Sequence, residues 1–191
     1  MRILVINGHP DPDKSHLCAA LADAYAKGAA DGGHQVDRLD VGALDFPMIR
    51  SLKDYQGPAV TPDIRRAQDL AEEADHLVVV FPIWFGSPPG LLKGFFEQVL
   101  RKGYALSTPQ AAMSSVLSGK TARLIVTMGA PAPVFRLFLG GHGVQALVKG
   151  LLWITGVGPV RQTLLGGAHL NKPAQKARWL AQVEALGRQG R

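Results

Sequence analysis

Short apolar runs alternate along the chain with longer segments in which apolar residues recur every three or four positions. The first pattern is typical of strands that are covered on both faces, and the second is typical of helices with one buried face. The predicted strands are residues 2–7, 34–41, 77–81, 121–127 and 160–165. The predicted helices are residues 16–31, 61–74, 88–100, 144–154 and 173–186.

Strands that alternate with helices predict a doubly wound α/β fold around a parallel sheet. The short early units favour the strand order 2-1-3-4-5, which is the flavodoxin-like order. We therefore expect residues 1–191 to form a single flavodoxin-like domain with a five-stranded parallel sheet. No G-x-G-x-x-G fingerprint follows the first strand, which argues against the usual dinucleotide-binding domain. Residues 42–60 and 101–119 are expected to be long loops.

Residues 76–100 combine a buried strand, an aromatic loop and a helix, and we expect them to contain the active site. In an open parallel sheet, ligands bind beyond the carboxyl ends of the strands, which is where Trp84 and Phe85 would lie. Flat side chains at this edge favour a flat ligand. The alternative is that both rings merely cap the core.

The loops after the first and fourth strands are expected to open into the same crevice. Ser15 is predicted to cap the helix that follows the first loop, and free amides at a helix start favour a phosphate. The alternative is that Ser15 serves only as a cap. In the second loop, residues 128–133, glycine and short side chains let backbone amides approach a ligand.

The net charge of +6 is unevenly distributed, because residues 1–97 sum to −5 and residues 98–191 to +11. A positive half attracts anions, but its basic residues are scattered and no aromatic RNA-binding motif accompanies them. We therefore expect a small phosphorylated ligand and no nucleic-acid partner.

No pair of histidines or carboxylates has metal-ligand spacing on one element, so no metal is expected. Prolines after Ser87 exclude the G-x-S-x-G elbow of serine hydrolases.

Cys18 is the only cysteine, so neither an intrachain disulfide nor a thiolate metal cluster can form. Its apolar neighbours on the predicted helix indicate a buried, unreactive thiol. The N-terminal strand does not have the pattern of a signal peptide, and residues 151–160 are too short to cross a bilayer. These features predict a cytoplasmic protein without membrane insertion.

Three stretches together resemble the NAD(P)H:quinone oxidoreductase family of flavodoxin-like flavoproteins, which also includes flavoprotein subunits that regulate bacterial potassium efflux. They are GHPDPDKSH at 8–16, residues 61–100, and the strand, loop and His-Gly pair within 121–143. The resemblance extends to about residue 165, and its most specific part is the middle stretch.

The resemblance implies a bound flavin, NAD(P)H as electron donor and a quinone or similar planar acceptor reduced by two electrons. We expect FAD, with FMN as the alternative. The loop of residues 9–16 has one hydroxyl and two aspartates, which suit the terminal phosphate of FMN poorly, whereas the pyrophosphate of FAD carries less charge per phosphorus. The resemblance also implies a homodimer with the flavin ring near the interface, because this family builds its pocket from both chains. The helix bearing Phe95 and Phe96 is apolar enough to pack outward as well as inward. The alternative function is a regulatory subunit that docks on a partner such as a potassium-efflux transporter.

The resemblance also implies roles for particular residues. The flavin phosphates would be held by His9, Ser15, His16 and Leu17. The ring would be bordered on one side by Pro82, Ile83, Trp84 and Phe85, and on the other by Thr127, Met128, Gly129 and Ala130. The expected catalytic residues are His142, Trp84 and Phe85.

Two departures from the family pattern affect this site. The aromatic loop is one residue shorter between Pro82 and Trp84 than in mammalian-type enzymes, which could shift the ring. Phe135 stands where the family has a tyrosine, which removes a hydroxyl. The roles of His9 and His142 depend on the resemblance, because a lone loop histidine is more often structural.

Overall fold

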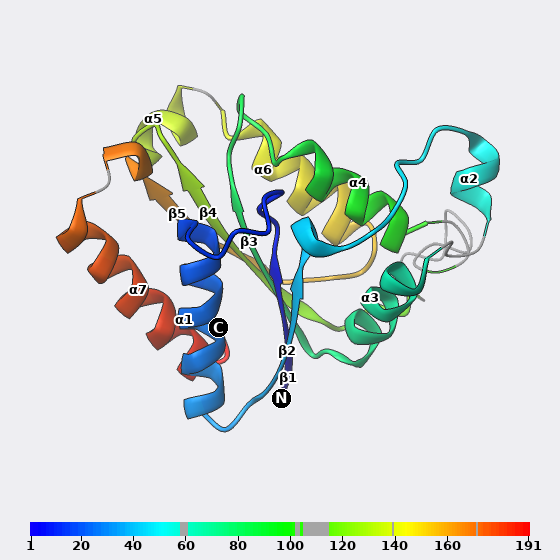
Figure 1. Ribbon diagram of the computed structural model, residues 1–191, viewed down its shortest axis with the longest axis horizontal. Helices are drawn as coiled ribbons and strands as arrows, with labels where there is room; N and C mark the ends of the chain where they lie inside the picture. The colour runs from blue at the N-terminus through cyan, green and yellow to red at the C-terminus, as the bar shows by residue number, and fades with distance from the viewer. Residues whose placement is uncertain (58–60, 102–103, 105–114, 139, 171) are drawn as a thin grey trace.

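The computed structural model describes residues 1–57, 61–101, 104, 115–138, 140–170 and 172–191. Its strands form one parallel sheet in the order β2-β1-β3-β4-β5 (Figure 1). They are β1 (Arg2–Asn7), β2 (Gln35–Asp40), β3 (His76–Pro82), β4 (Thr121–Met128) and β5 (Val160–Gly166). The predicted flavodoxin-like fold and strand order are confirmed.

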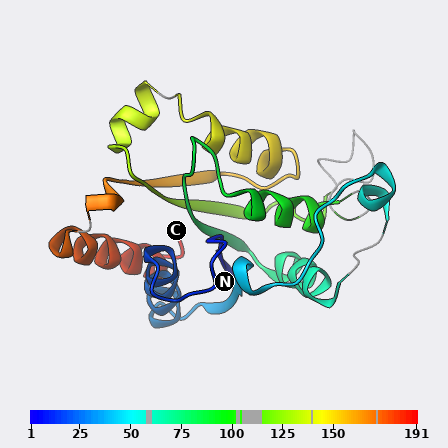
Figure 2. The same cartoon turned by 45° about the horizontal axis from the view of Figure 1, so that its top comes forward.

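Helices cover both faces of the sheet. They are α1 (Leu17–Asp31), α2 (Leu52–Gln56), α3 (Pro62–Glu73), α4 (Gly90–Val99), α5 (Ala132–Leu137), α6 (His142–Leu147) and α7 (Pro173–Arg188). α1 and α7 lie on one side of the sheet, and α3, α4 and α6 lie on the other (Figure 2). Buried residues of α1 and α7 form one core with their face of the sheet, and those of α3, α4 and α6 form a second core with the opposite face. The central strands are therefore buried on both faces, which explains their continuous apolar runs.

Several predicted boundaries require correction. Residues 142–154 are not one regular helix, because α6 passes into a π-helical turn, Val148–Trp153. The connection at 42–60 contains a short 3₁₀ turn, Val41–Ala43, and α2, while residues 58–60 lie outside the described residues. Most of the predicted loop at 101–119 also lies outside them.

Ser15 is not the N-cap of α1, so this prediction is wrong. His16 occupies the cap position and makes no side-chain capping bond. The physical reason lies in the preceding turn, where the Ser15 amide donates to the Asp13 carboxylate at 2.8 Å. This turn leaves Ser15 outside the helix. The predicted cap of α3 is confirmed, because Thr61 Oγ1 accepts from the Ile64 amide at 3.3 Å.

The helix bearing Phe95 and Phe96 does not turn these rings outward. Both side chains are buried in the core, where their ring centroids lie 5.5 Å apart. Phe46, from the connection before α2, packs against Phe95 at 6.1 Å. Phe95 and Phe96 are therefore core residues, and they do not support outward packing of this helix.

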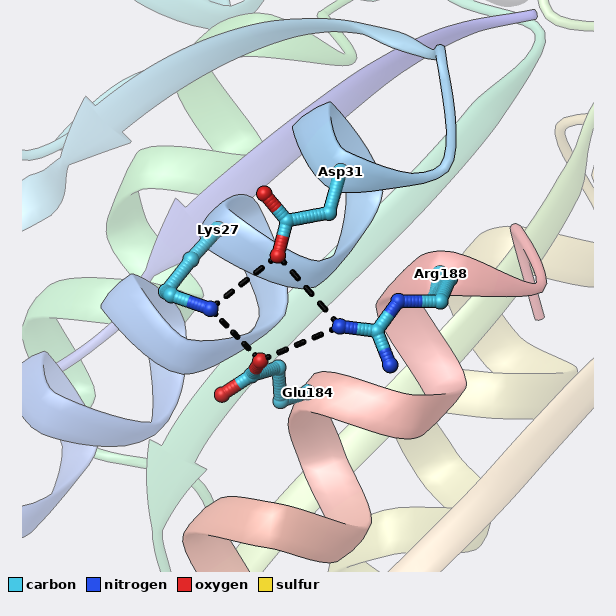
Figure 3. Close-up of polar contacts among 4 residues, drawn as sticks. All are labelled: Lys27, Asp31, Glu184 and Arg188. Atoms are coloured by element: carbon cyan, nitrogen blue, oxygen red, sulfur yellow. Dashed lines mark hydrogen bonds and ion pairs between the residues drawn. The ribbon is translucent and has the colours of Figure 1, made fainter.

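α1 and α7 pack closely through glycines and are joined at the surface by four charges. A Cβ atom on Gly28 would lie 1.9 Å from the Glu184 carbonyl oxygen, so the backbones approach at a spacing that only glycine allows. Lys27 bridges Asp31 at 3.0 Å and Glu184 at 2.6 Å, and Arg188 approaches both carboxylates at 3.3 Å (Figure 3). Exposed ion pairs contribute little individually, so the apolar contact beneath them carries most of this packing.

The first residue of β3, His76, is buried without a full set of hydrogen bonds. Its Nδ1 atom lies 2.6 Å from Thr121 Oγ1, whereas Nε2 has no partner among the described residues. Burial lowers the pKa of His76 to about 4, and the nearby positive charge of Arg123 acts in the same direction.

We expect this depressed pKa to make folding pH-dependent. The folded protein holds His76 neutral, so its contribution to stability is present above about pH 6.5 and is lost as the pH falls towards 4. The loss amounts to about 3 kcal/mol over this window. Urea unfolding at several pH values should show a shallower pH dependence for His76→Gln than for the wild type. Identical slopes would contradict this account.

Candidate functional site

The loops that follow β1 and β3 meet at the carboxyl edge of the sheet. The Gly8 amide donates to the Val80 carbonyl at 2.7 Å, which ties the first loop to β3. The ring of His9 stacks on His16 with centroids 4.0 Å apart and meets Trp84 edge-on at 5.8 Å. We call His9, His16 and Trp84 the aromatic cluster. It brings together residues from two predicted parts of the site.

Two aspartates hold the first loop in shape. Asp11 accepts from the Asp13 amide at 2.9 Å and lies 2.9 Å from His16 Nε2, while Asp13 accepts from the Ser15 amide at 2.8 Å. The Asp13 amide and the His16 ring lower the pKa of Asp11, and the Ser15 amide lowers the pKa of Asp13. Both carboxylates are therefore charged at neutral pH. Partial burial lowers the pKa of His9, which favours its neutral form.

A small cavity of about 170 Å³ lies between the start of α1 and the start of α7. It is lined by Ser15, His16, Leu17, Gly167, Ala168, Lys172, Gln175, Lys176 and Trp179. The first turn of α1 carries no acidic residue and no side-chain cap, so its amides complement an anion. With two lysines beside them, these amides could hold phosphate groups.

The aromatic loop after β3 is a tight hairpin. Trp84 and Ser87 exchange backbone hydrogen bonds of 2.9 and 3.0 Å, and Phe85 and Gly86 between them have φ angles of 48° and 81°. Such a turn normally favours Asn or Gly, so Phe85 sits in a conformation that costs energy. Phe85 is fully exposed, which excludes its interpretation as a cap of the core, and Trp84 is about half exposed.

The end of β4 is tied through its backbone to the residue that follows β3. The Ile83 amide donates to the Thr127 carbonyl at 2.8 Å, next to the pairing of Pro82 with Thr127. The side chains of Thr127 and Met128 are buried, whereas Gly129 is exposed and Ala130 half-buried. A ligand at this edge can therefore meet Gly129 and Ala130 directly.

Cys18 lies behind the second loop and not in the crevice. Its sulfur is 3.5 Å from Thr127 Oγ1, and burial raises the pKa of the thiol to about 11. The prediction of a buried, protonated Cys18 is confirmed.

His142 is the exposed first residue of α6 and lies near the hairpin. Its ring lies over Gly140, because a Cβ atom built there would be 2.2 Å from His142 Nε2. A Cβ atom on Gly143 would be 2.2 Å from the Gly86 carbonyl oxygen, so the start of α6 packs against the hairpin tip. Phe135 is buried beneath this segment, with its Cε1 3.6 Å from the Cβ position of Gly141.

The structure adds residues that the sequence analysis missed, namely Lys172, Lys176 and Trp179. The four-residue spacing of Lys172 and Lys176, just before and within the first turn of the predicted helix at 173–186, was the available signal. The lysines could be assigned only once α7 was known to lie beside α1, because Lys172 and Lys176 then line the same cavity as Ser15 and Leu17.

Neither a metal site nor a membrane span is seen in the part of the chain that the structure describes. No group of three or more histidine, cysteine, aspartate or glutamate side chains there could hold a metal ion. No helix among the same residues is long and apolar enough to cross a bilayer.

A five-stranded parallel sheet in the order 2-1-3-4-5, with a crevice at its carboxyl edge, defines the flavodoxin-like class. The family model described as "Flavodoxin-like fold" matches residues 1–188. The chain belongs to this family.

Curated relatives include two oxidoreductases. A Haemophilus influenzae protein named "Uncharacterized NAD(P)H oxidoreductase" is 27% identical over 182 residues, which cover 93% of this chain and 90% of that protein. Human ribosyldihydronicotinamide dehydrogenase [quinone] is 36% identical over 154 residues. That match covers 70% of this chain and 66% of the human protein, slightly under two thirds of its length.

Solved structures of the same fold include two oxidoreductases. NAD(P)H:quinone oxidoreductase from Methanothermobacter marburgensis has a TM-score of 0.82 and 20% identity, covering 99% of this chain and 95% of that one. An FMN-dependent NADH-azoreductase from Bacillus anthracis in complex with FMN has a TM-score of 0.72 and 14% identity, covering 99% of both chains. At these identities the likeness shows the fold alone.

Proposed function

We propose that this protein is a flavin-dependent NAD(P)H dehydrogenase that reduces quinones or similar planar acceptors by two electrons. The observation that carries the proposal is the aromatic cluster, in which His9 from the first loop meets Trp84 from the hairpin at 5.8 Å. This contact places the start of α1, whose free amides suit a phosphate, beside the aromatic hairpin. Both lie at the carboxyl edge of the sheet, where such folds bind ligands. The names of the relatives support the same activity. One buried cysteine suits a cytoplasmic enzyme.

The residues of the crevice fit a flavin in two respects. Uncapped amides at the start of α1 and two lysines suit its phosphates, and the exposed backbone at Gly129 leaves room for a ring edge. We assign the phosphates to His9, Ser15, His16 and Leu17, and the ring borders to Pro82–Phe85 and Thr127–Ala130. When bound, the flavin supplies hydride exchange between donor and acceptor.

The chain itself would position the substrates and stabilise charge. Trp84 and Phe85 offer flat surfaces against which a planar acceptor can stack. The His142 imidazole, exposed beside the hairpin, would donate an N–H to the oxygen that gains negative charge. The buried side chains of Thr127 and Met128 leave only their backbone groups for a ligand.

Steady-state kinetics on the purified, flavin-loaded chain test this function. We expect NADPH oxidation to depend on added 1,4-naphthoquinone without any partner protein. Such turnover would also count against a subunit that acts only by docking on a transporter. Absence of turnover after reconstitution with both FAD and FMN would refute the proposal.

We propose FAD as the cofactor, with FMN as the alternative. The amides of Asp13 and Ser15 already donate to carboxylates. The charged Asp11 and Asp13 disfavour the FMN phosphate, which concentrates two charges on one phosphorus, more than the FAD pyrophosphate, which carries one charge on each. Lys172 and Lys176 extend the positive surface beyond one phosphate, which suits the second half of a dinucleotide.

Mass spectrometry of the cofactor released from the purified protein is expected to find FAD. The double change of Lys172 and Lys176 to Gln should weaken FAD binding by about tenfold or more, as loss of charge-assisted hydrogen bonds does, and affect FMN less. Arg178→Gln on the same helix serves as the matched control. Release of FMN alone would overturn the assignment.

We propose that the protein forms a homodimer through apolar side chains at the crevice end. Phe85, Leu137 and Phe138 are exposed large hydrophobic residues near this end. These side chains replace Phe95 and Phe96 as the candidate interface. Light scattering at micromolar concentration should give twice the chain mass, and a monomer would contradict the proposal.

His142→Ala should slow turnover by roughly 10- to 1,000-fold, as removal of one preorganised donor does, while flavin binding changes little. Phe135→Tyr should give at most a small gain, because Phe135 is buried and does not aim a hydroxyl at the crevice. Stopped-flow reduction by NADPH and reoxidation by quinone measure the two half-reactions separately. Unchanged rates per flavin-loaded His142→Ala enzyme would leave this histidine a structural role only.

A further inference from the structure

A second, larger cavity of about 760 Å³ lies between α5, α6 and the edge strand β5. Phe135 and Arg136 line it from α5, Val144 and Gln145 from α6, and Gln162 and Leu164 from β5. No residue of the aromatic cluster lines it. Its wall includes Gly140, which lies under the His142 ring, so the cavity borders the segment that carries this histidine.

The lining has an unbalanced charge. Arg136 is the only charged residue among the described residues that line the cavity, and no acid accompanies it. Within the same described part of the chain, the side chains of Arg136, Gln145 and Gln162 form no hydrogen bond or ion pair with protein groups. Arg136 and Gln162 are exposed and Gln145 is half-buried, so these three side chains can exchange water for a molecule in the cavity.

The remaining walls are apolar. Phe135 is buried and Leu164 is half-buried, and together with Val144 they offer a surface for a hydrocarbon ring. A guanidinium binds one carboxylate or sulfonate by donating paired N–H groups to its oxygens, and the two glutamine amides can donate to the remaining oxygens. A nicotinamide dinucleotide phosphate carries several charges, for which one arginine is a poor match.

We infer that this cavity binds the anionic substituent of a planar acceptor that carries one carboxylate or sulfonate, with Arg136 as the specificity-determining residue. The inference rests on the proposed function, because the acceptor must reach the crevice beside His142. It narrows the acceptors from planar molecules in general to acidic ones.

Kinetics of the flavin-loaded enzyme with a charged and a neutral acceptor test the inference. The probes are 1,2-naphthoquinone-4-sulfonate and 1,4-naphthoquinone, each with NADPH as donor. Arg136→Gln should lower the preference for the sulfonate, taken as the ratio of kcat/KM values relative to wild type, by about tenfold or more, mainly through KM. Arg136→Lys should retain part of the preference, because lysine keeps the positive charge but loses the paired, planar N–H donors of the guanidinium.

Arg66→Gln provides the matched control, since Arg66 is an exposed arginine on α3, in the other half of the molecule (Figure 1). Its acceptor ratio should equal that of the wild type. Equal losses for both acceptors in Arg136→Gln would indicate a purely structural role at the end of α5 and overturn the inference. A loss that merely follows dissociation of a dimer, seen by light scattering, would also overturn it.

Calorimetric binding of naphthalene-2-sulfonate, which cannot be reduced, separates this inference from the proposed function. Wild-type protein should bind the probe at least tenfold more tightly than Arg136→Gln, as expected for a charged hydrogen bond. Failed turnover with both quinones would refute the enzyme function, whereas equal binding of the sulfonate by both proteins would refute the anion site itself.

Discussion

The pairing of β1 with β3 is the constraint on which the crevice depends. Because the two strands are parallel neighbours, the loops that follow them leave the sheet at the same edge. The bond from the Gly8 amide to the Val80 carbonyl continues this pairing into the first loop. His9 is then carried to within 5.8 Å of Trp84, and the start of α1 faces the same space. Without this pairing, the start of α1 and the aromatic hairpin after β3 would not lie close enough to contribute to one site.

The opposite charges of the two halves of the chain also meet near this edge. Asp11 and Asp13 from the acidic half shape the first loop, and they do so by occupying backbone amides. Lys172 and Lys176 from the basic half lie across the small cavity from Ser15. The loop after β1 is thus held by its two carboxylates and is negatively charged on that side. A phosphate would be attracted instead by the lysines at the start of α7 and by the free amides at the start of α1.

The sequence predicted the sheet, its order and the cap at Thr61 because apolar periodicity and capping chemistry act over a few residues. It failed at Ser15, whose backbone amide donates to the Asp13 carboxylate in the turn before α1. It could not assign Phe95 and Phe96 to the core, because core and interface positions have the same apolar pattern. Lys172 and Lys176 could not be assigned, because their meaning depends on the contact between the first and last helices. The roles of His9 and His142 came from resemblance and stay predictions.

An anaerobic titration tests the central claim that the crevice holds a flavin which exchanges hydride with both substrates. The flavin-loaded protein should lose its absorbance at about 450 nm on addition of one equivalent of NADPH, because a reduced flavin no longer absorbs there. One equivalent of 1,4-naphthoquinone should then restore the absorbance. A bound flavin whose spectrum NADPH leaves unchanged would contradict the account.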